Sequence, residues 1–350
     1  MRPVLRFAIA VCVLSSTAFA QDPAIPARAM ASGRDGIPAP DRIRLAEAFR
    51  LADELGDSVW TGWNHAPFGI LLVTPDREFL IRHPLPVQGF DLVGYDSLLG
   101  ARIFARPRTM PTGLLATYPA LDTVPVIVVG QAELTGRRST SWVLTILHEH
   151  FHQWQMSSPR YSERVTALGL ARGDTTGMWM LNYAFPYRSA AVRTRFDKFS
   201  RDLVTATAEV THERWSHADG SLQSQRRLRA ALNAADYRYM AFQMWQEGIA
   251  RYTELQVARL AARRFQASDA FRTLNGFTTF GQEADSLTSE VAAAGTLNLP
   301  QVQRVAFYPT GAAYALLLDR MRPEWKVGYL SGELTLDAAP PGRPRSRPRP

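Results

Sequence analysis

The sequence carries, near its middle, the stretch His148-Glu149-His150-Phe151-His152, which lies inside an apolar run from Trp142 to Trp154. Apolar residues recur in this run at intervals of three and four, a spacing that predicts a buried helix. The serine and threonine residues at 139–141 are candidate N-caps, and Ser158-Pro159 ends the pattern. The sequence therefore places three histidines and a glutamate on a helix that is otherwise suited to burial.

His148 and His152 are four residues apart, so their side chains share one face of that helix. Two imidazoles in this arrangement can bind one zinc ion, and Glu149 beside them can serve as general base for a metal-activated water. His150 is expected to point away from this face and to be structural. The competing interpretation is a polar helix face in solvent. The apolar run instead indicates burial, and a buried charged group is costly unless it is paired or bound to a metal.

A hydrolytic zinc site uses a third protein ligand and leaves one position to water. The best candidate is Glu247, which precedes Gly248 in a helical pattern from about Asp236 to Phe265. A glycine weakens a helix by about 1 kcal/mol relative to alanine, so Gly248 indicates close approach of another helix or of the metal site. Glu254, one heptad on, is the rival ligand or a partner of a ligand, and a surface position is the remaining interpretation of Glu247.

The H-E-x-x-H motif followed by a helical E-G-x-A resembles the gluzincin zinc metallopeptidases, the group of thermolysin and aminopeptidase N. The resemblance implies one Zn²⁺ per chain, held by His148, His152 and Glu247, with Glu149 as the base. It also implies a strand antiparallel to the substrate just before the zinc helix, for which Val124–Val129 has the right position.

Tyr308-Pro309-Thr310-Gly311-Ala312 is similar to the Y-x-x-G-A pattern of aminopeptidase-N-like proteins. There the tyrosine hydrogen-bonds the developing oxyanion, and the resemblance gives Tyr308 this catalytic role. Packing in the core is the alternative for Tyr308. The other candidate donors are Tyr183, Tyr187 and Tyr252.

The chain also departs from the family pattern. The segment between His152 and Glu247 is far longer than in the best-known gluzincins, and Arg251 stands where the thermolysin-type E-x-x-x-D has its aspartate. No G-x-M-E-N-type exopeptidase motif precedes the zinc helix. The resemblance therefore does not extend to aminopeptidase specificity.

The N-terminus has the features of a secretory signal peptide. Arg2 and Arg6 are followed by apolar residues at 7–16 and by the small-residue cleavage site Ala18-Phe19-Ala20. We expect residues 1–20 to be removed near Ala20 and the protein to be extracytoplasmic, either periplasmic or secreted. No later apolar stretch is long enough for a transmembrane segment. The only cysteine, Cys12, lies in the expected signal, so the mature chain can form no disulfide.

The formal charge of +8 does not indicate a nucleic-acid partner. Two arginines lie in the expected signal and four in the Pro/Arg-rich C-terminus, and no basic stripe with interleaved aromatic residues is visible between them. We expect the tail at 336–350 to be disordered and solvated, with contact to an anionic surface as the alternative.

We expect an α+β fold, with a small N-terminal sheet region packed on a mainly helical, gluzincin-like catalytic region. A helix from Asp41 to about Leu55 precedes four strand candidates. Two helices, Ala190–Ala208 and Leu222–Ala235, are expected to cover another element. The strand candidates are Gly69–Thr74, Glu78–Arg82, Arg102–Ala105 and Val124–Val129. The expected organisation is a signal peptide at 1–20, a linker at 21–40, an N-terminal α+β part at 41–135, a mainly helical metal-binding part at 136–335 and the tail at 336–350.

Two further motifs carry less weight. His212-Glu213 with His217 is one residue too long for H-E-x-x-H, and five residues turn a helix about 140° beyond a full turn, so we reject it as a site. The aromatic segment Met178–Tyr187 either lines a substrate pocket or belongs to the core.

Together these features predict a secreted or periplasmic zinc-dependent peptidase that hydrolyses peptide bonds in a peptide or protein substrate. Two alternatives remain open from the sequence. One is a zinc hydrolase that acts on a non-peptide amide or ester. The other is a non-catalytic metal-binding module, which would have no need of Glu149 as a base.

Overall fold

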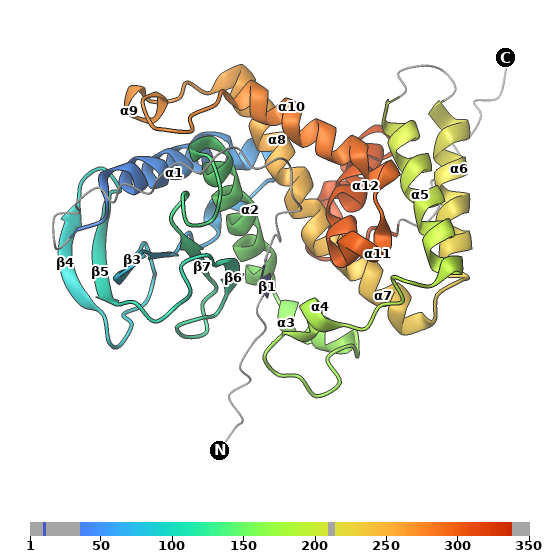
Figure 1. The fold of residues 1–350 in the computed structure, drawn as a ribbon, viewed down its shortest axis with the longest axis horizontal. Helices are drawn as coiled ribbons and strands as arrows, with labels where there is room; N and C mark the ends of the chain where they lie inside the picture. Colours follow the sequence, from blue (N-terminus) through green and yellow to red (C-terminus); the bar gives the residue numbers. More distant parts are fainter. Residues whose placement is uncertain (1–9, 12–35, 209–213, 338–350) are drawn as a thin grey trace, which may run out of the picture. The chain divides into compact units, whose positions relative to one another are not determined.

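The computed structural model describes residues 10–11, 36–208 and 214–337 (Figure 1). By compactness the chain forms two units, Met1–Tyr183 with Thr253–Thr288 and Ala184–Tyr252 with Ser289–Pro350. The N-terminal region contains a mixed sheet and most of the remainder is helical, which confirms the predicted α+β class. The expected signal peptide, linker and tail lie outside the described residues except at 10–11, 36–40 and 336–337, and so does His212-Glu213 of the rejected motif.

Six strands form the mixed sheet, and the two-residue strand β1 pairs with β6 at its margin. The strand order is β1-β6-β7-β2-β3-β5-β4, and every pair is antiparallel except β2 with β7. The strands are β1 (Ala10–Val11), β2 (Ile70–Val73), β3 (Arg77–Ile81), β4 (Asp91–Asp96), β5 (Ala101–Pro107), β6 (Leu115–Tyr118) and β7 (Val126–Gly130).

The structure contains four strands near the positions expected from sequence and three, β4, β6 and the two-residue β1, that the sequence did not indicate. Of these, β4 and β6 belong to the main part of the sheet. β4 is an exposed edge strand with aspartates at both ends and a glycine inside, a composition that resembles a turn. β6 has only four residues. Both strands lack the apolar alternation that a sequence pattern needs.

The expectation that Val124–Val129 pairs antiparallel with a substrate is wrong. This strand, β7, hydrogen-bonds β2 on one side, with Ile127 opposite Ile70, and β6 on the other, with Val129 opposite Leu115. With both sides of its backbone used, it cannot pair with a further strand.

Helices α1 (Ala39–Val59) and α2 (Ser139–Ser157) pack against each other in the first unit, and α2 also contacts β6 and β7 (Figure 1). Alternate side chains of the central strands form a cluster that includes Leu71, Leu80 and Val128, against which partly buried loop residues pack. The strands are thus buried on both faces, which explains their continuous apolar sequences.

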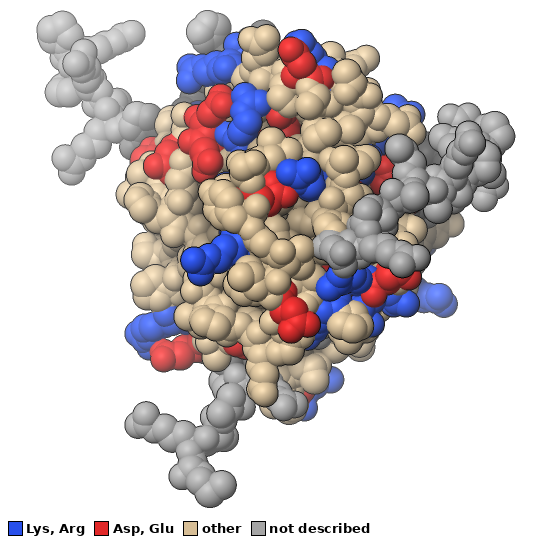
Figure 2. All heavy atoms as spheres, turned by 90° about the vertical axis from the view of Figure 1, so that its left-hand side faces the viewer, with Lys and Arg blue, Asp and Glu red and all other residues tan. Residues whose placement is uncertain are grey.

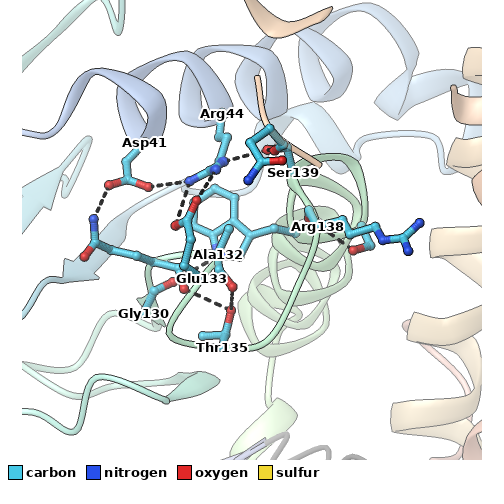
Figure 3. A network of polar contacts seen from close by, with 12 residues as sticks. Asp41, Arg44, Gly130, Ala132, Glu133, Thr135, Arg138 and Ser139 are labelled. Carbon is cyan, nitrogen blue, oxygen red and sulfur yellow. Dashed lines mark hydrogen bonds and ion pairs between the residues drawn. The ribbon is translucent and has the colours of Figure 1, made fainter. Parts of the chain in front are cut away.

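A buried arginine joins the beginnings of α1 and α2 (Figure 3). The Arg44 guanidinium donates to Asp41 at 2.9 Å, to Glu133 at 2.5 Å and to Ser139 Oγ at 3.0 Å. Gln131 in turn donates to Asp41 at 2.5 Å. The helix expected to begin at Asp41 begins at Ala39, and the Asp41 carboxylate pairs with Arg44. This network fixes the N-terminus of the helix that carries H-E-x-x-H.

The second unit is helical in its described residues, and α5 (Ala190–Ala208) runs beside α6 (Arg214–Arg229) in Figure 1. The helix expected at 222–235 is interrupted because Asn233 caps α7 (Ala234–Gln243), its side chain accepting from the Asp236 amide at 2.8 Å. The π-helical turn η2 (Met244–Gly248) and α8 (Ile249–Arg264) continue α7, so one helical segment runs from 234 to 264 and passes from the second unit into the first.

The remaining helices are short or C-terminal. They are η1 (Trp63–His65), α3 (Tyr161–Ala167), α4 (Trp179–Asn182), α9 (Asp269–Arg272), α10 (Phe280–Ala292), η3 (Ala293–Thr296), α11 (Leu299–Val302), η4 (Gln303–Ala306), α12 (Phe307–Met321) and η5 (Pro323–Gly328). Among the described residues, no helix has the length and apolar character that crossing a membrane requires. On the face in Figure 2, basic and acidic side chains are interspersed rather than separated by sign.

Candidate metal centre

The H-E-x-x-H segment lies in α2 as predicted, and its polar side chains are almost completely buried. His148 is 3% exposed, and His152 and Glu149 are 0% exposed. The two imidazoles stand edge to face with ring centroids 5.0 Å apart, as the four-residue spacing requires. The interpretation of this segment as a polar face in solvent is therefore excluded.

His148, His152 and Glu247 form a buried group that could hold a metal ion. Each offers one ligand atom, and these atoms all lie within 4.8 Å of one another. Two histidines and one carboxylate are a ligand set that catalytic zinc sites use. Of the two glutamates considered from sequence, Glu247 is the one in this group.

Polar contacts of the Nδ1 atoms orient both histidines. His148 Nδ1 lies 3.4 Å from Glu254 Oε2, and His152 Nδ1 lies 2.6 Å from Gln155 Oε1. Because an amide oxygen only accepts, the bond to Gln155 places the proton of His152 on Nδ1 and its lone pair on Nε2. The group of two histidines and one carboxylate fits a metal ion, and Glu254 lies beside His148 rather than in this group.

Glu247 lies in η2, which the structure assigns to a π-helix. Single π-helical turns inside α-helices are rare and occur frequently at functional sites. Gly248 follows it directly, and a Cβ built on Gly248 would stand 2.5 Å from the Gly311 Cα atom. The close approach of another helix, expected from the glycine, is confirmed, and that helix is α12.

Glu149 is held by a residue of the sheet. The Thr117 hydroxyl, on β6, lies 2.8 Å from Glu149 Oε2 and 2.9 Å from the Glu149 backbone oxygen. Both residues are 0% exposed. One hydroxyl of the sheet therefore holds a buried carboxylate that is adjacent in sequence to His148 of the group that could hold a metal ion.

His150 packs between aromatic side chains. Its ring stacks on Phe68, with centroids 3.8 Å apart, and on Trp63, with centroids 5.4 Å apart. Nδ1 lies 3.0 Å from Gln153 Oε1. Burial lowers the pKa of His150 to about 4, so the ring is neutral at pH 7.

Tyr308 lies in the first turn of α12 and is 1% exposed. Arg304 Nη1 donates to its hydroxyl oxygen at 2.7 Å. Because arginine can only donate, this bond uses the oxygen and not the phenolic proton. Gln303, before Arg304, has φ 49°, a value that non-glycine residues rarely adopt and that is frequent near functional sites.

The other tyrosines considered as donors have structural partners. Tyr252 donates to Asp319 Oδ2 at 2.7 Å, and Arg172 lies over the Tyr183 ring. Tyr187 packs on Phe185, which is 5% exposed and contacts Phe307. These contacts favour the core interpretation for the end of the aromatic segment 178–187.

Two residues of the site were missed from sequence, Thr117 and Gln155. Gln155 follows His152 by three residues and could have been found from helical spacing alone. Thr117 could not, because its contact with Glu149 joins two elements 32 positions apart. No protein-family model, curated protein or solved structure matches this chain.

Proposed function

We propose that this protein is a zinc-dependent peptidase that acts outside the cytoplasm, with one Zn²⁺ held by His148, His152 and Glu247. The observation that carries the proposal is the buried group of these three side chains with Glu149 adjacent to it in sequence and also buried. The absence of thiolate ligands and the single carboxylate favour a hydrolytic site, since structural zinc sites usually contain cysteine.

When bound, the metal would polarise the scissile carbonyl and lower the pKa of a bound water. Glu149 would take the proton of the attacking water and pass it to the leaving amine. A base is useful only in a reaction, so its place beside the ligands supports an enzyme rather than a binding module. Tyr308 would donate its hydroxyl to the oxygen on which negative charge develops.

The extracytoplasmic location rests on the sequence of residues 1–20, with the basic start, the apolar run and Ala18-Phe19-Ala20. N-terminal sequencing of the exported protein tests it, and the expected first residue is at or near Gln21. An uncleaved chain recovered from the cytoplasm would rule out this part of the proposal.

The test of the activity combines metal analysis of the purified mature protein with digestion of a peptide library. We expect one zinc per chain and cleavage that a chelator abolishes. Glu149→Gln keeps the size of the side chain but cannot accept the proton. The variant should bind zinc normally, and its hydrolysis rate should fall about 10²–10⁴-fold.

Glu163→Gln is a matched control, because Glu163 is an exposed helical glutamate that pairs with Arg160 on the same helix end. Its activity should equal that of the wild type. Unchanged turnover in Glu149→Gln would rule out the mechanism. Zinc binding with cleavage of amide or ester compounds but of no peptide would instead identify a hydrolase of the alternative class.

A further inference from the structure

The sheet supplies a residue to the proposed base. Thr117 Oγ1 is within hydrogen-bond distance of two oxygens of Glu149, the carboxylate Oε2 at 2.8 Å and the backbone oxygen at 2.9 Å. Thr117 is 0% exposed. A buried hydroxyl that reaches the side chain and the main chain of one residue restricts the rotation of that side chain.

The position of Thr117 does not depend on α2. Its strand is paired with β7, where Thr117 lies opposite Ile127, and β7 is in turn paired with β2. Threonine is β-branched and has a stiff χ1 angle, so the sheet fixes the hydroxyl as well as the backbone. The base is thus aligned by an element other than the helix that carries the histidines.

The hydroxyl has one proton and can donate it to one oxygen at a time. A bond to a charged carboxylate is about twice as strong as one to a neutral carbonyl, so Oε2 is the preferred acceptor. With Oε2 held by Thr117, the direction of the second carboxylate oxygen, Oε1, is fixed as well.

We propose that Thr117 is a positioning residue for Glu149: its hydroxyl fixes Oε2 and thereby aims Oε1 at the attacking water. This inference rests on the proposed role of Glu149 as the base. It adds a residue that lies outside the H-E-x-x-H segment and contributes no ligand to the metal.

Thr117→Val removes the hydroxyl and keeps the β-branched shape, so β6 should persist. We expect kcat to fall about 10- to 100-fold, which corresponds to loss of one hydrogen bond to a charged group, with KM and zinc content unchanged. Thr117→Ser restores the hydroxyl and should recover most of the activity. In the Glu149→Gln background, Thr117→Val should have no further effect on the residual rate.

Thr145→Val is the matched control. Thr145 is also a buried threonine, but it lies on α2 and its hydroxyl donates to the Ser141 backbone oxygen at 2.9 Å. Loss of this hydroxyl should leave kcat unchanged. An equal fall in kcat for Thr145→Val and Thr117→Val would mean that any buried threonine has this effect, and would overturn the proposal.

Crystal structures of the wild type, Thr117→Ser and Thr117→Val give a readout that does not need activity. The Glu149 carboxylate should occupy one position in the first two and a displaced position or several positions in Thr117→Val. If Thr117→Val keeps both the carboxylate position and full kcat, Thr117 is only part of the core. If no substrate is cleaved by the wild type, the proposed function fails, whereas the carboxylate position still decides whether Thr117 holds Glu149.

Discussion

Gly248 and Gly311 are in direct backbone contact. A Cβ atom on Gly248 would stand 2.5 Å from the Gly311 Cα atom, and one on Gly311 would stand 2.7 Å from the Gly248 Cα atom. The turn that carries Glu247 and the helix that carries Tyr308 therefore cross at the distance that only two glycines allow. The crossing fixes the proposed third ligand and the proposed oxyanion donor relative to each other.

Gly248→Ala and Gly311→Ala should both destabilise the protein. Each new methyl group would overlap backbone atoms, which cannot move aside without separating the helices, and overpacking of this kind costs about 1–3 kcal/mol. Thermal unfolding of the metal-free variants measures the effect, and zinc titration should show weaker binding.

Gly220→Ala is the control for this pair, because Gly220 lies in α6 and no atom stands within 4 Å of the position that an alanine methyl group would take there. Alanine is the better helix former, so this variant should gain up to about 1 kcal/mol. If Gly248→Ala were as stable as Gly220→Ala, the two helices would not be in contact in solution.

Glu247 and Glu254 are expected to differ in what their removal does to zinc binding. Glu247→Ala removes a ligand and should abolish stoichiometric binding. Glu254→Ala removes only the partner of His148 Nδ1 and should weaken the affinity about 10- to 100-fold, with Glu254→Gln close to the wild type because its amide oxygen still accepts. Competition with a chelator measures both, and the reverse order would make Glu254 the ligand.

The comparison of Glu247 with Glu254 also shows where sequence reasoning stops. Arg251 stands where the thermolysin-type pattern has an aspartate. From the sequence alone, the site therefore lacks that carboxylate partner. In the structure a carboxylate does reach His148, but from Glu254, one heptad after Glu247. The π-helical turn at Met244–Gly248 changes the directions in which the side chains of this helical segment point. No residue pattern in the sequence indicates this turn.

Features that depend on short spacing could be predicted, and features that depend on tertiary contacts could not. The common face of His148 and His152 follows from helical geometry within one segment. The bond from Thr117 to Glu149 depends on β6, a four-residue strand that has no periodicity to detect. The sequence also could not show that Val124–Val129 lies between two other strands, because pairing order cannot be deduced from strand propensity.

Glu78 gives a prediction for acid pH. It is buried, which alone would raise its pKa, but its Oε1 accepts from the Thr109 amide at 2.6 Å and the Met110 amide at 2.5 Å, and its Oε2 accepts from Arg106 at 2.6 Å. These bonds outweigh burial and lower the pKa below 4.5. They also hold the loop that leads into β6.

Because the folded-state pKa of Glu78 is lowered, its stabilising contribution is complete above about pH 4.5 and is lost as the pH falls through the folded-state value. Glu78→Gln should be less stable at pH 7 and should lose less stability than the wild type between pH 5 and the acid limit of folding. Denaturant unfolding across this range measures the two slopes. Parallel slopes would mean that another carboxylate dominates acid unfolding.

The last prediction concerns Tyr308. A fixed donor helps most if it is aimed at the oxyanion of the transition state rather than at the substrate. Arg304 Nη1 donates to the phenol oxygen at 2.7 Å and thereby fixes the position of the hydroxyl group. Tyr308→Phe should therefore lower kcat about 10²–10³-fold with little change in KM, and folding and zinc content should persist.

Tyr314→Phe is the control on the same helix, since Tyr314 is also buried and its hydroxyl donates to Gln225 at 3.1 Å. Its kcat should stay at the wild-type value, because the lost bond stabilises the helical unit and not the reacting oxygen. Steady-state kinetics on both variants, with zinc measured in each, separates the two roles. Full kcat in zinc-loaded Tyr308→Phe would assign Tyr308 to the core, where its bond to Arg304 would serve only to begin α12.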